Sequence, residues 1–211
     1  MPEEQSKKKG IFGKLMDVIT GSPTGSESEA PEKGKFAPKK EDPIDIRFVR
    51  HFTKNGGLFL YCGTNSEVID ALGDFTKEHN LMAIGAAEDN ALSYLKKTGL
   101  GNINPELSEC DAIFTYCEAL IAFNGSIMVN ENQTKGLKIN EMPKYHIILG
   151  KTSQLVENLS AAMTRVNQRY RENRPMHIST LRGPQDEQVK LASADPNKDR
   201  VLFLLLIEDS L

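Results

Sequence analysis

The dipeptide Asn124-Gly125 most constrains how this chain folds, because it stands between two short β-prone runs, residues 119–123 and 126–130. Asn-Gly in such a position is a strong hairpin signal, since both residues tolerate the positive φ angles of a type I′ turn. A third apolar run, residues 145–149, is followed by a long helical pattern. This stretch therefore predicts a hairpin, a loop, a strand and a helix at the centre of the fold.

Strand and helix patterns alternate upstream of the hairpin. Apolar residues with helical spacing stop at Asn55-Gly56-Gly57, where glycine suits a helix C-terminus. Thr64-Asn65-Ser66-Glu67 has the form of a capping box, which predicts that a second helix begins there. The predicted strands on either side of this helix are residues 58–62 and 81–84, and a further helix runs to Lys97. Such alternation predicts parallel strands joined by right-handed crossovers.

The C-terminal part of the chain continues the alternation. Ser153 is predicted to cap a helix with an apolar face over residues 155–166, and residues 177–181 are a predicted strand. Residues 201–207 are apolar throughout, which predicts a central strand covered on both faces. The fold we expect over residues 44–211 is one α/β domain, a three-layer α/β/α sandwich with a mainly parallel sheet and the hairpin attached.

Composition argues against several classes of protein. A net charge of -3 gives no basic field for nucleic acid. The three cysteines lack CxxC spacing and cannot alone hold a structural zinc ion or an iron–sulfur cluster, so we expect no cofactor in this chain. No apolar run approaches the roughly 20 residues of a transmembrane helix, and no signal peptide pattern is visible. We therefore expect a cytoplasmic protein with reduced thiols and no transmembrane segment.

The first 43 residues differ from the rest of the chain. They are rich in proline and in charge of both signs, which predicts a disordered tail. One apolar island near residues 10–20 has helical spacing and follows Lys7-Lys8-Lys9. Two interpretations stay open: a short helix that packs transiently on its own domain, or a weak docking segment, residues 7–19, for an anionic membrane surface or a partner.

Three blocks in the second half of the chain carry a resemblance. Glu118 precedes a short apolar strand, a turn at Phe123-Asn124-Gly125 and another strand. Pro143-Lys144-Tyr145-His146-Ile147 enters the next strand, and Gly183-Pro184 comes before the final one. In their residues and in their order along the chain, these blocks resemble the LUD domain, the lactate-utilisation (LutC/YkgG-like) family. The resemblance implies a fold similar to the NagB/RpiA and coenzyme A transferase type.

The same resemblance implies an accessory role in the oxidation of lactate to pyruvate, with electron transfer in iron–sulfur partner subunits. The polar signature departs from the family pattern, however. Phe123, Asn124, Gln185 and Val189 stand where the family has Glu, Thr, Ser and Asp. These replacements favour an alternative, a non-catalytic module that binds a small anion or acts as a scaffold. Whether the chain is an enzyme stays open, and we expect no turnover by the chain alone.

Candidate ligand-binding residues lie near predicted strand ends. A turn between a strand and a helix N-terminus presents amide groups to an anion, although every capped helix has the same form. An arginine at a strand exit could bind a carboxylate or phosphate through two hydrogen bonds, or pair with a surface acid. The candidates are Gly63, Thr64, Asn65, Ser66, Glu118, His146, Arg182 and Gly183.

Two of these candidates also have structural interpretations, which the sequence favours over the functional ones. His146 either donates to an anionic ligand or bonds a loop carbonyl, and Glu118 is either a site carboxylate or a solvated acid at a strand end. Ligands of open α/β sheets bind outside the carboxyl ends of the strands. We therefore expect a small carboxylate or a phosphorylated ligand to bind where the candidates converge at that edge.

Removing residues 1–40 is expected to leave the melting temperature of the domain nearly unchanged, because such a segment buries little apolar surface. Thermal unfolding of the full and shortened chains measures this. A fall of more than about 4 °C, roughly the effect of 1 kcal/mol in a domain of this size, would show that the tail packs on the fold.

Overall fold

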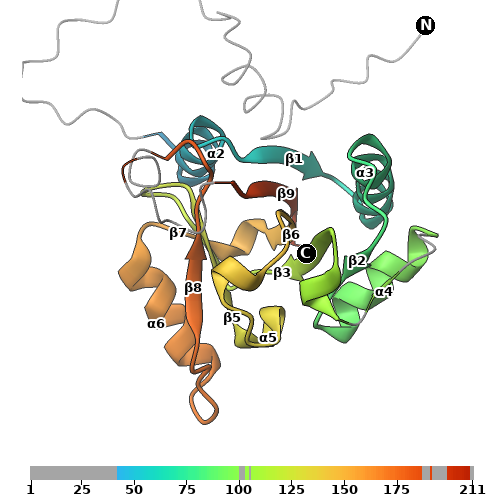
Figure 1. Cartoon of the computed structure of the whole chain (residues 1–211). Helices are drawn as coiled ribbons and strands as arrows, with labels where there is room; N and C mark the ends of the chain where they lie inside the picture. Colours follow the sequence, from blue (N-terminus) through green and yellow to red (C-terminus); the bar gives the residue numbers. More distant parts are fainter. Residues whose placement is uncertain (1–41, 100–102, 105, 187–190, 192–198, 210–211) are drawn as a thin grey trace, which may run out of the picture.

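The computed structural model describes residues 42–99, 103–104, 106–186, 191 and 199–209. The predicted disordered tail and its apolar island lie almost entirely outside the described residues. In the described part, the strands form two sheets (Figure 1). The first is a parallel five-stranded sheet of order β1-β9-β6-β3-β2. Its strands are β1 (Leu58–Cys62), β2 (Ile84–Gly85), β3 (Ala112–Tyr116), β6 (Tyr145–Lys151) and β9 (Val201–Ile207).

The second sheet is mixed and has the order β7-β4-β5-β8. Strands β4 and β5 are antiparallel, so the predicted hairpin is confirmed, and β8 adds to it in antiparallel orientation. Strand β7 pairs with β4 in parallel. The strands of this second sheet are β4 (Ala119–Ile121), β5 (Ser126–Asn130), β7 (Leu155–Val156) and β8 (Ile178–Leu181).

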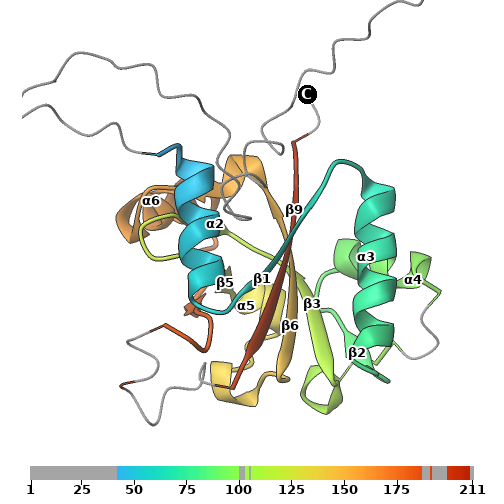
Figure 2. The same cartoon turned by 90° about the horizontal axis from the view of Figure 1, so that it is seen from above.

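The helices cover both sheets. Figure 2 shows α3 (Asn65–Glu78) and α4 (Asp89–Lys97) on one side of the parallel sheet, and α2 (Ile44–Lys54) and α6 (Leu159–Arg169) on the other. The second sheet packs between the parallel sheet and α6 through two apolar clusters. An α/β fold with a parallel sheet is therefore confirmed, but the three-layer sandwich is wrong here, because a second sheet intervenes. The shorter helices are η1 (Leu107–Glu109), α5 (Glu131–Thr134), η2 (Ile139–Glu141) and η3 (Thr152–Gln154).

Strand β9 confirms the prediction of a central strand that is apolar on both faces. Leu202, Leu204 and Leu206 belong to the cluster shared with α2 and the second sheet. Phe203 and Leu205 belong to the cluster under α3 and α4. Alternate side chains therefore hold helices and strands against opposite faces of one strand.

Strand β3 has no counterpart among the predicted strands. It is separated from β4 only by Cys117-Glu118, with no glycine or proline to mark a break. At these two residues the chain leaves the parallel sheet and enters the second one, where the Glu118 amide already donates to the Met128 carbonyl oxygen at 2.8 Å. The missing turn signal explains why the sequence suggested a single sheet.

Two further predictions need correction. Residues 155–156 form β7, and α6 is capped by Asn158, whose side chain accepts from the Ala161 amide at 3.0 Å, so Ser153 is not the cap. The hairpin loop, residues 122–125, is not a type I′ turn, because Gly125 has a positive φ and Asn124 does not. The Asn124 side chain instead accepts from the Ser126 amide at 3.2 Å, a local bond that defines a different turn.

The hairpin loop lies against helix α2. A side chain at Gly125 would place its first carbon 2.4 Å from the Phe52 nitrogen and 2.6 Å from the His51 carbonyl carbon. The His51 Nδ1 donates to the Ala122 carbonyl oxygen at 2.8 Å, and the Asn55 side chain donates to the Asn124 carbonyl oxygen at 2.9 Å. The glycine therefore permits two backbones to approach closely.

Gly125→Ala is expected to lower the free energy of unfolding by about 2–4 kcal/mol, because the new methyl group meets a backbone and the residue keeps a left-handed conformation. Gly73→Ala is the matched control, since Gly73 lies inside α3 with open space around it. It is expected to raise stability by about 0.5–1 kcal/mol. Denaturant unfolding of both variants measures this, and equal effects would contradict the close approach.

Candidate functional site

A pocket of about 570 Å³ lies at the carboxyl ends of the parallel strands. Strands β3, β6 and β9 run in the same direction, so their C-terminal residues meet at this edge. Open α/β sheets bind ligands at this edge. The pocket is lined by Asn65, Glu88, Asn90, Tyr94, Tyr116, Cys117, Gln133, Leu149, Lys151, Ser153, Gln154, Arg165, Arg169, Ile207, Glu208 and Asp209.

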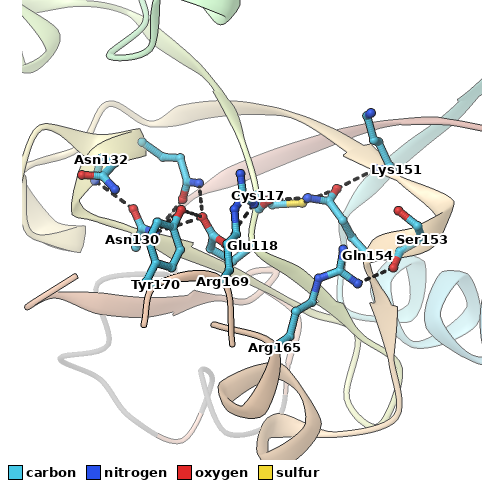
Figure 3. Close-up of polar contacts among 11 residues, drawn as sticks. Cys117, Glu118, Asn130, Asn132, Lys151, Ser153, Gln154, Arg165, Arg169 and Tyr170 are labelled. Atoms are coloured by element: carbon cyan, nitrogen blue, oxygen red, sulfur yellow. Dashed lines mark hydrogen bonds and ion pairs between the residues drawn. The ribbon is translucent and has the colours of Figure 1, made fainter. Parts of the chain in front are cut away.

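Two arginines from α6 face this edge (Figure 3). Arg165 and Arg169 are one helical turn apart and therefore lie on the same side of the helix. The Arg165 Nη1 donates to the Ser153 carbonyl oxygen. The Arg169 Nη1 lies 3.3 Å from Glu118 Oε2, and the Arg169 side chain is 57% exposed. These guanidinium groups give one wall of the pocket a positive charge.

Glu118 anchors Arg169 from the protein interior. Its side chain is only 1% exposed, so its interpretation as a solvated acid is wrong. Its Oε1 accepts hydrogen bonds from the side chains of Asn130 at 2.9 Å and Gln133 at 2.7 Å. Oε1 also accepts from the Tyr170 hydroxyl at 2.8 Å (Figure 3). A buried carboxylate requires such donors, because leaving water without them costs several kcal/mol.

Gln154 holds the bottom of the pocket in place. Its amide group donates to the Cys117 carbonyl oxygen, and its Oε1 accepts from the Lys151 amide at 2.7 Å. The Cys117 Sγ also donates to Oε1, at 3.4 Å. Burial raises the pKa of the Cys117 thiol well above its ordinary value. The thiol therefore stays protonated at neutral pH and is a poor nucleophile.

The far wall carries acidic groups. The Asp209 carboxylate accepts from the Ser153 amide at 2.8 Å and lies 3.7 Å from the Lys151 ammonium. Hydrogen bonds from Ser153, followed by Lys151, lower the pKa of Asp209. Its charge offsets part of the Lys151 charge, as Glu118 offsets part of the Arg169 charge, whereas the hydrogen bond of Arg165 goes to an uncharged group, the Ser153 carbonyl oxygen.

Two amides at the predicted anion-binding turn, those of Gly63 and Glu67, are used within the turn itself. The Gly63 amide donates to Glu67 Oε2 at 2.9 Å, and the Glu67 amide donates to the Thr64 hydroxyl at 3.2 Å, which confirms Thr64 as the cap of α3. Ser66 is exposed in the first turn of the helix. Of these four candidates only Asn65 lines the pocket, where it accepts a hydrogen bond from the Tyr94 hydroxyl.

The structure places the other candidates away from the pocket lining. His146 is fully buried and its Nε2 is 2.7 Å from the Thr115 hydroxyl; burial, and then Arg200, hold its pKa well below the ordinary value. Arg182 lies 3.9 Å from Asp186, and a Cβ at Gly183 would be 2.0 Å from the Asn55 carbonyl oxygen. His146 therefore packs as a neutral side chain, and Gly183 permits a close backbone contact.

Sequence reasoning missed the main charged residues of the pocket. Arg165 and Arg169 were interpretable as cations that favour the C-terminal end of a helix dipole, and Glu88 as part of a helix start. A signal for the arginines does exist, because their four-residue spacing places both on the polar face of α6. No local pattern shows that this face meets the ends of distant strands.

The part of the chain that the structure describes shows neither a ligand set for a metal ion nor a helix able to cross a membrane. Over residues 42–99, 106–186 and 199–209, no three His, Cys, Asp or Glu side chains gather as a ligand set for a metal ion. Nor does any helix in these ranges have the length and apolar character needed to cross a bilayer.

Comparisons with known proteins give a family and a fold. The family model described as LUD domain matches residues 46–206, well over half of the chain. The crystal structure of a DUF162 family protein from Deinococcus radiodurans superposes with a TM-score of 0.58. That match covers 79% of this chain and 96% of that one at 17% sequence identity, so it supports the fold alone. No curated protein matches the chain.

Glu118→Ala is expected to lower the free energy of unfolding by about 2–4 kcal/mol, because it leaves the donors of Asn130, Gln133 and Tyr170 without a charged acceptor. Glu172→Ala removes an exposed glutamate and is expected to change stability by less than about 0.5 kcal/mol. Denaturant unfolding at neutral pH compares them. A small effect of both would mean that the buried network contributes little.

Proposed function

We propose that this chain, which belongs to the LUD domain family, binds a small carboxylate in the pocket at the strand ends and assists the oxidation of lactate to pyruvate. Electron transfer would take place in iron–sulfur partner subunits. The observation that carries the binding step is the pair Arg165 and Arg169 on one wall of the pocket. The choice of lactate and pyruvate rests on the family.

Guanidinium groups suit this task. Their planar array of N–H donors matches a carboxylate or a phosphate, and they stay charged at every physiological pH. Glu118 engages Nη1 of Arg169, which orients the guanidinium while more than half of the side chain stays accessible. An arginine that is fixed in this way loses little conformational entropy when an anion binds.

The size of the pocket allows more than one ligand class. Its volume of about 570 Å³ falls in the usual range of small-molecule sites. A three-carbon acid fills only part of it, so a phosphorylated ligand also fits the charge and the space. This keeps both small carboxylates and phosphorylated metabolites as ligand classes for the test.

A non-catalytic small-anion-binding or scaffold module is the second candidate function. It is favoured by the protonated Cys117 thiol and by Phe123 and Gln185, which stand where the resembling family has a glutamate and a serine. The anion-binding form of this second candidate uses the same pocket as the first, and the two differ in whether iron–sulfur subunits associate with the chain. Association is therefore the property that separates them.

Calorimetric titration of the purified full chain with L-lactate, D-lactate, pyruvate and inorganic phosphate tests the binding step. We expect at least one organic acid to bind, and Arg165→Ala to weaken it by ~1.5–3 kcal/mol because a charged hydrogen bond is lost. Arg174→Ala, an exposed arginine outside the pocket, is the matched control. Arg182→Ala tests whether the ligand binds instead at the exit of β8, where the sequence predicted a site.

The outcomes of these titrations are distinct. Loss of affinity in Arg182→Ala but not in Arg165→Ala would move the site to the β8 exit, and absence of binding by every probe would refute the proposal. Purification of the tagged chain from its native cells, followed by identification of associated subunits, tests the partner. Absence of iron–sulfur subunits there would favour the second candidate, and turnover by the isolated chain would contradict a purely accessory role.

A further inference from the structure

Glu88 is a pocket residue with an oxygen that the protein leaves unbonded. It lies between β2 and α4 at the N-cap position of that helix, but its side chain makes no capping hydrogen bond. It lines the pocket, and its Oε2 is buried without a hydrogen-bond partner in the part of the chain that the structure describes. A buried carboxyl oxygen without a partner is costly unless a ligand or a proton satisfies it.

The groups around Glu88 are unevenly charged. Glu118 disfavours a negative charge on Glu88, whereas Arg169 and a hydrogen bond from the Tyr116 backbone amide favour it. Burial has the largest effect, and the net result is a raised pKa of Glu88. Glu118 lies behind Arg169. The titratable groups that line the pocket with Glu88 come from α4, β3, β6, α6 and the residues after β3 and β9: Tyr94, Tyr116, Cys117, Lys151, Arg165, Arg169, Glu208 and Asp209.

The tyrosines and the thiol add no charge near neutral pH. Burial, with smaller effects of Tyr94 and Glu88, raises the pKa of Tyr116 to about 12. Burial likewise raises the pKa of Tyr94 and of Cys117. The charges that act on Glu88 are therefore those of Glu118 and Arg169, while Lys151, Arg165, Glu208 and Asp209 are further charged groups of the pocket lining. A bound organic anion adds a further negative charge beside Glu88, Glu208 and Asp209.

We propose that the pocket takes up a small carboxylate together with one proton, which Glu88 holds at Oε2 and donates in a hydrogen bond to an oxygen of the ligand. The proton comes from solvent, and no bond of the ligand forms or breaks. Uptake of a proton offsets the negative charge that the ligand brings, and it supplies the missing partner of Oε2. This inference rests on the proposed function, because it concerns the same pocket.

The arrangement also defines the ligand class. One end of the ligand must carry the anionic group that Arg165 and Arg169 bind, and an uncharged oxygen must accept from Glu88. A 2-oxo or 2-hydroxy acid has both groups on neighbouring carbons, whereas a simple fatty acid has only the first. Pyruvate should therefore bind more tightly than acetate or propionate, which lack the second oxygen.

Titration of the full chain with pyruvate in two buffers of different ionisation enthalpy tests the proposal. The dependence of the measured enthalpy on the buffer gives the number of protons taken up, and we expect this number to approach one above the pKa of Glu88 in the free chain. Affinity should fall about tenfold per pH unit in that range, since the ionised form must first be protonated. Below the pKa of Glu88 in the free chain, both the dependence of affinity on pH and the uptake of a proton should vanish.

Glu88→Gln separates this role from a structural one. The glutamine amide imitates the protonated carboxyl as a donor, so the variant should bind pyruvate with no proton uptake and with little dependence on pH. Glu172→Gln, an exposed glutamate outside the pocket, should behave like the wild type. Melting temperatures of all three proteins show that each is folded.

Pyruvate binding without proton uptake at any pH, or uptake that persists in Glu88→Gln, would overturn the inference while the proposed function stands. Equal affinity for pyruvate and propionate would also overturn it. If neither pyruvate nor lactate binds the folded wild-type chain, the proposed function fails, and the inference fails with it. If pyruvate binding is lost in Arg165→Ala but the wild-type chain takes up no proton on binding, the proposed function stands and only the inference about Glu88 fails.

Discussion

The buried charge of Glu118 is the constraint on which this architecture depends. A carboxylate that leaves water must recover several kcal/mol through donors in fixed positions. Those donors come from β5, from α5 and from the C-terminal end of α6. All three elements must therefore be in place at once around the point where the chain crosses between sheets. The same requirement orients Arg169 at the edge of the pocket, so the stability of the second sheet and the charge of the site share one origin.

The pocket combines parts that are distant in the sequence. Parallel strands bring the C-terminal ends of β3, β6 and β9 to one edge. Helix α6, which packs on the second sheet, adds two arginines to the pocket there. Two cations of the pocket have acidic partners, because Asp209 pairs with Lys151 and Glu118 with Arg169. Glu88 stands outside these pairs. The site therefore has a defined polarity, which a ligand with an acidic end and a neutral oxygen would match.

Apolar pattern and turn chemistry predicted much of the fold. The runs at β1, β6 and β9 and the helices α2, α3 and α4 are where the sequence indicated them. Glycine follows β1 and lies near the C-terminal ends of α2 and α4, Thr64 caps α3, and β9 is marked by its continuous apolar run. The second sheet was not predictable in this way. Cys117-Glu118 carries no turn signal, and an abrupt change of sheet within two residues is a tertiary event.

The candidate site was harder to predict for a related reason. Glycine, proline and cap motifs drew attention to Gly63, Thr64 and Gly183, where such residues also serve ordinary backbone packing. Arg165, Arg169 and Glu88 have no distinguishing local motif, and only the folded arrangement places them around one space. Of the predicted candidates, Asn65 lies in this pocket and Glu118 supports it from behind.

The crossing at Cys117-Glu118 also has a mechanical consequence. One wall of the pocket belongs to α6, which rests on the second sheet, and the opposite wall consists of strand ends of the first sheet. The two sheets meet across an apolar interface without shared strand hydrogen bonds in the described part of the chain. A small sliding or tilting of one sheet on the other would thus change the width of the opening directly. Two short crossings between the sheets, Cys117-Glu118 and η3, lie beside this opening, so such a movement would bend the chain at both of them.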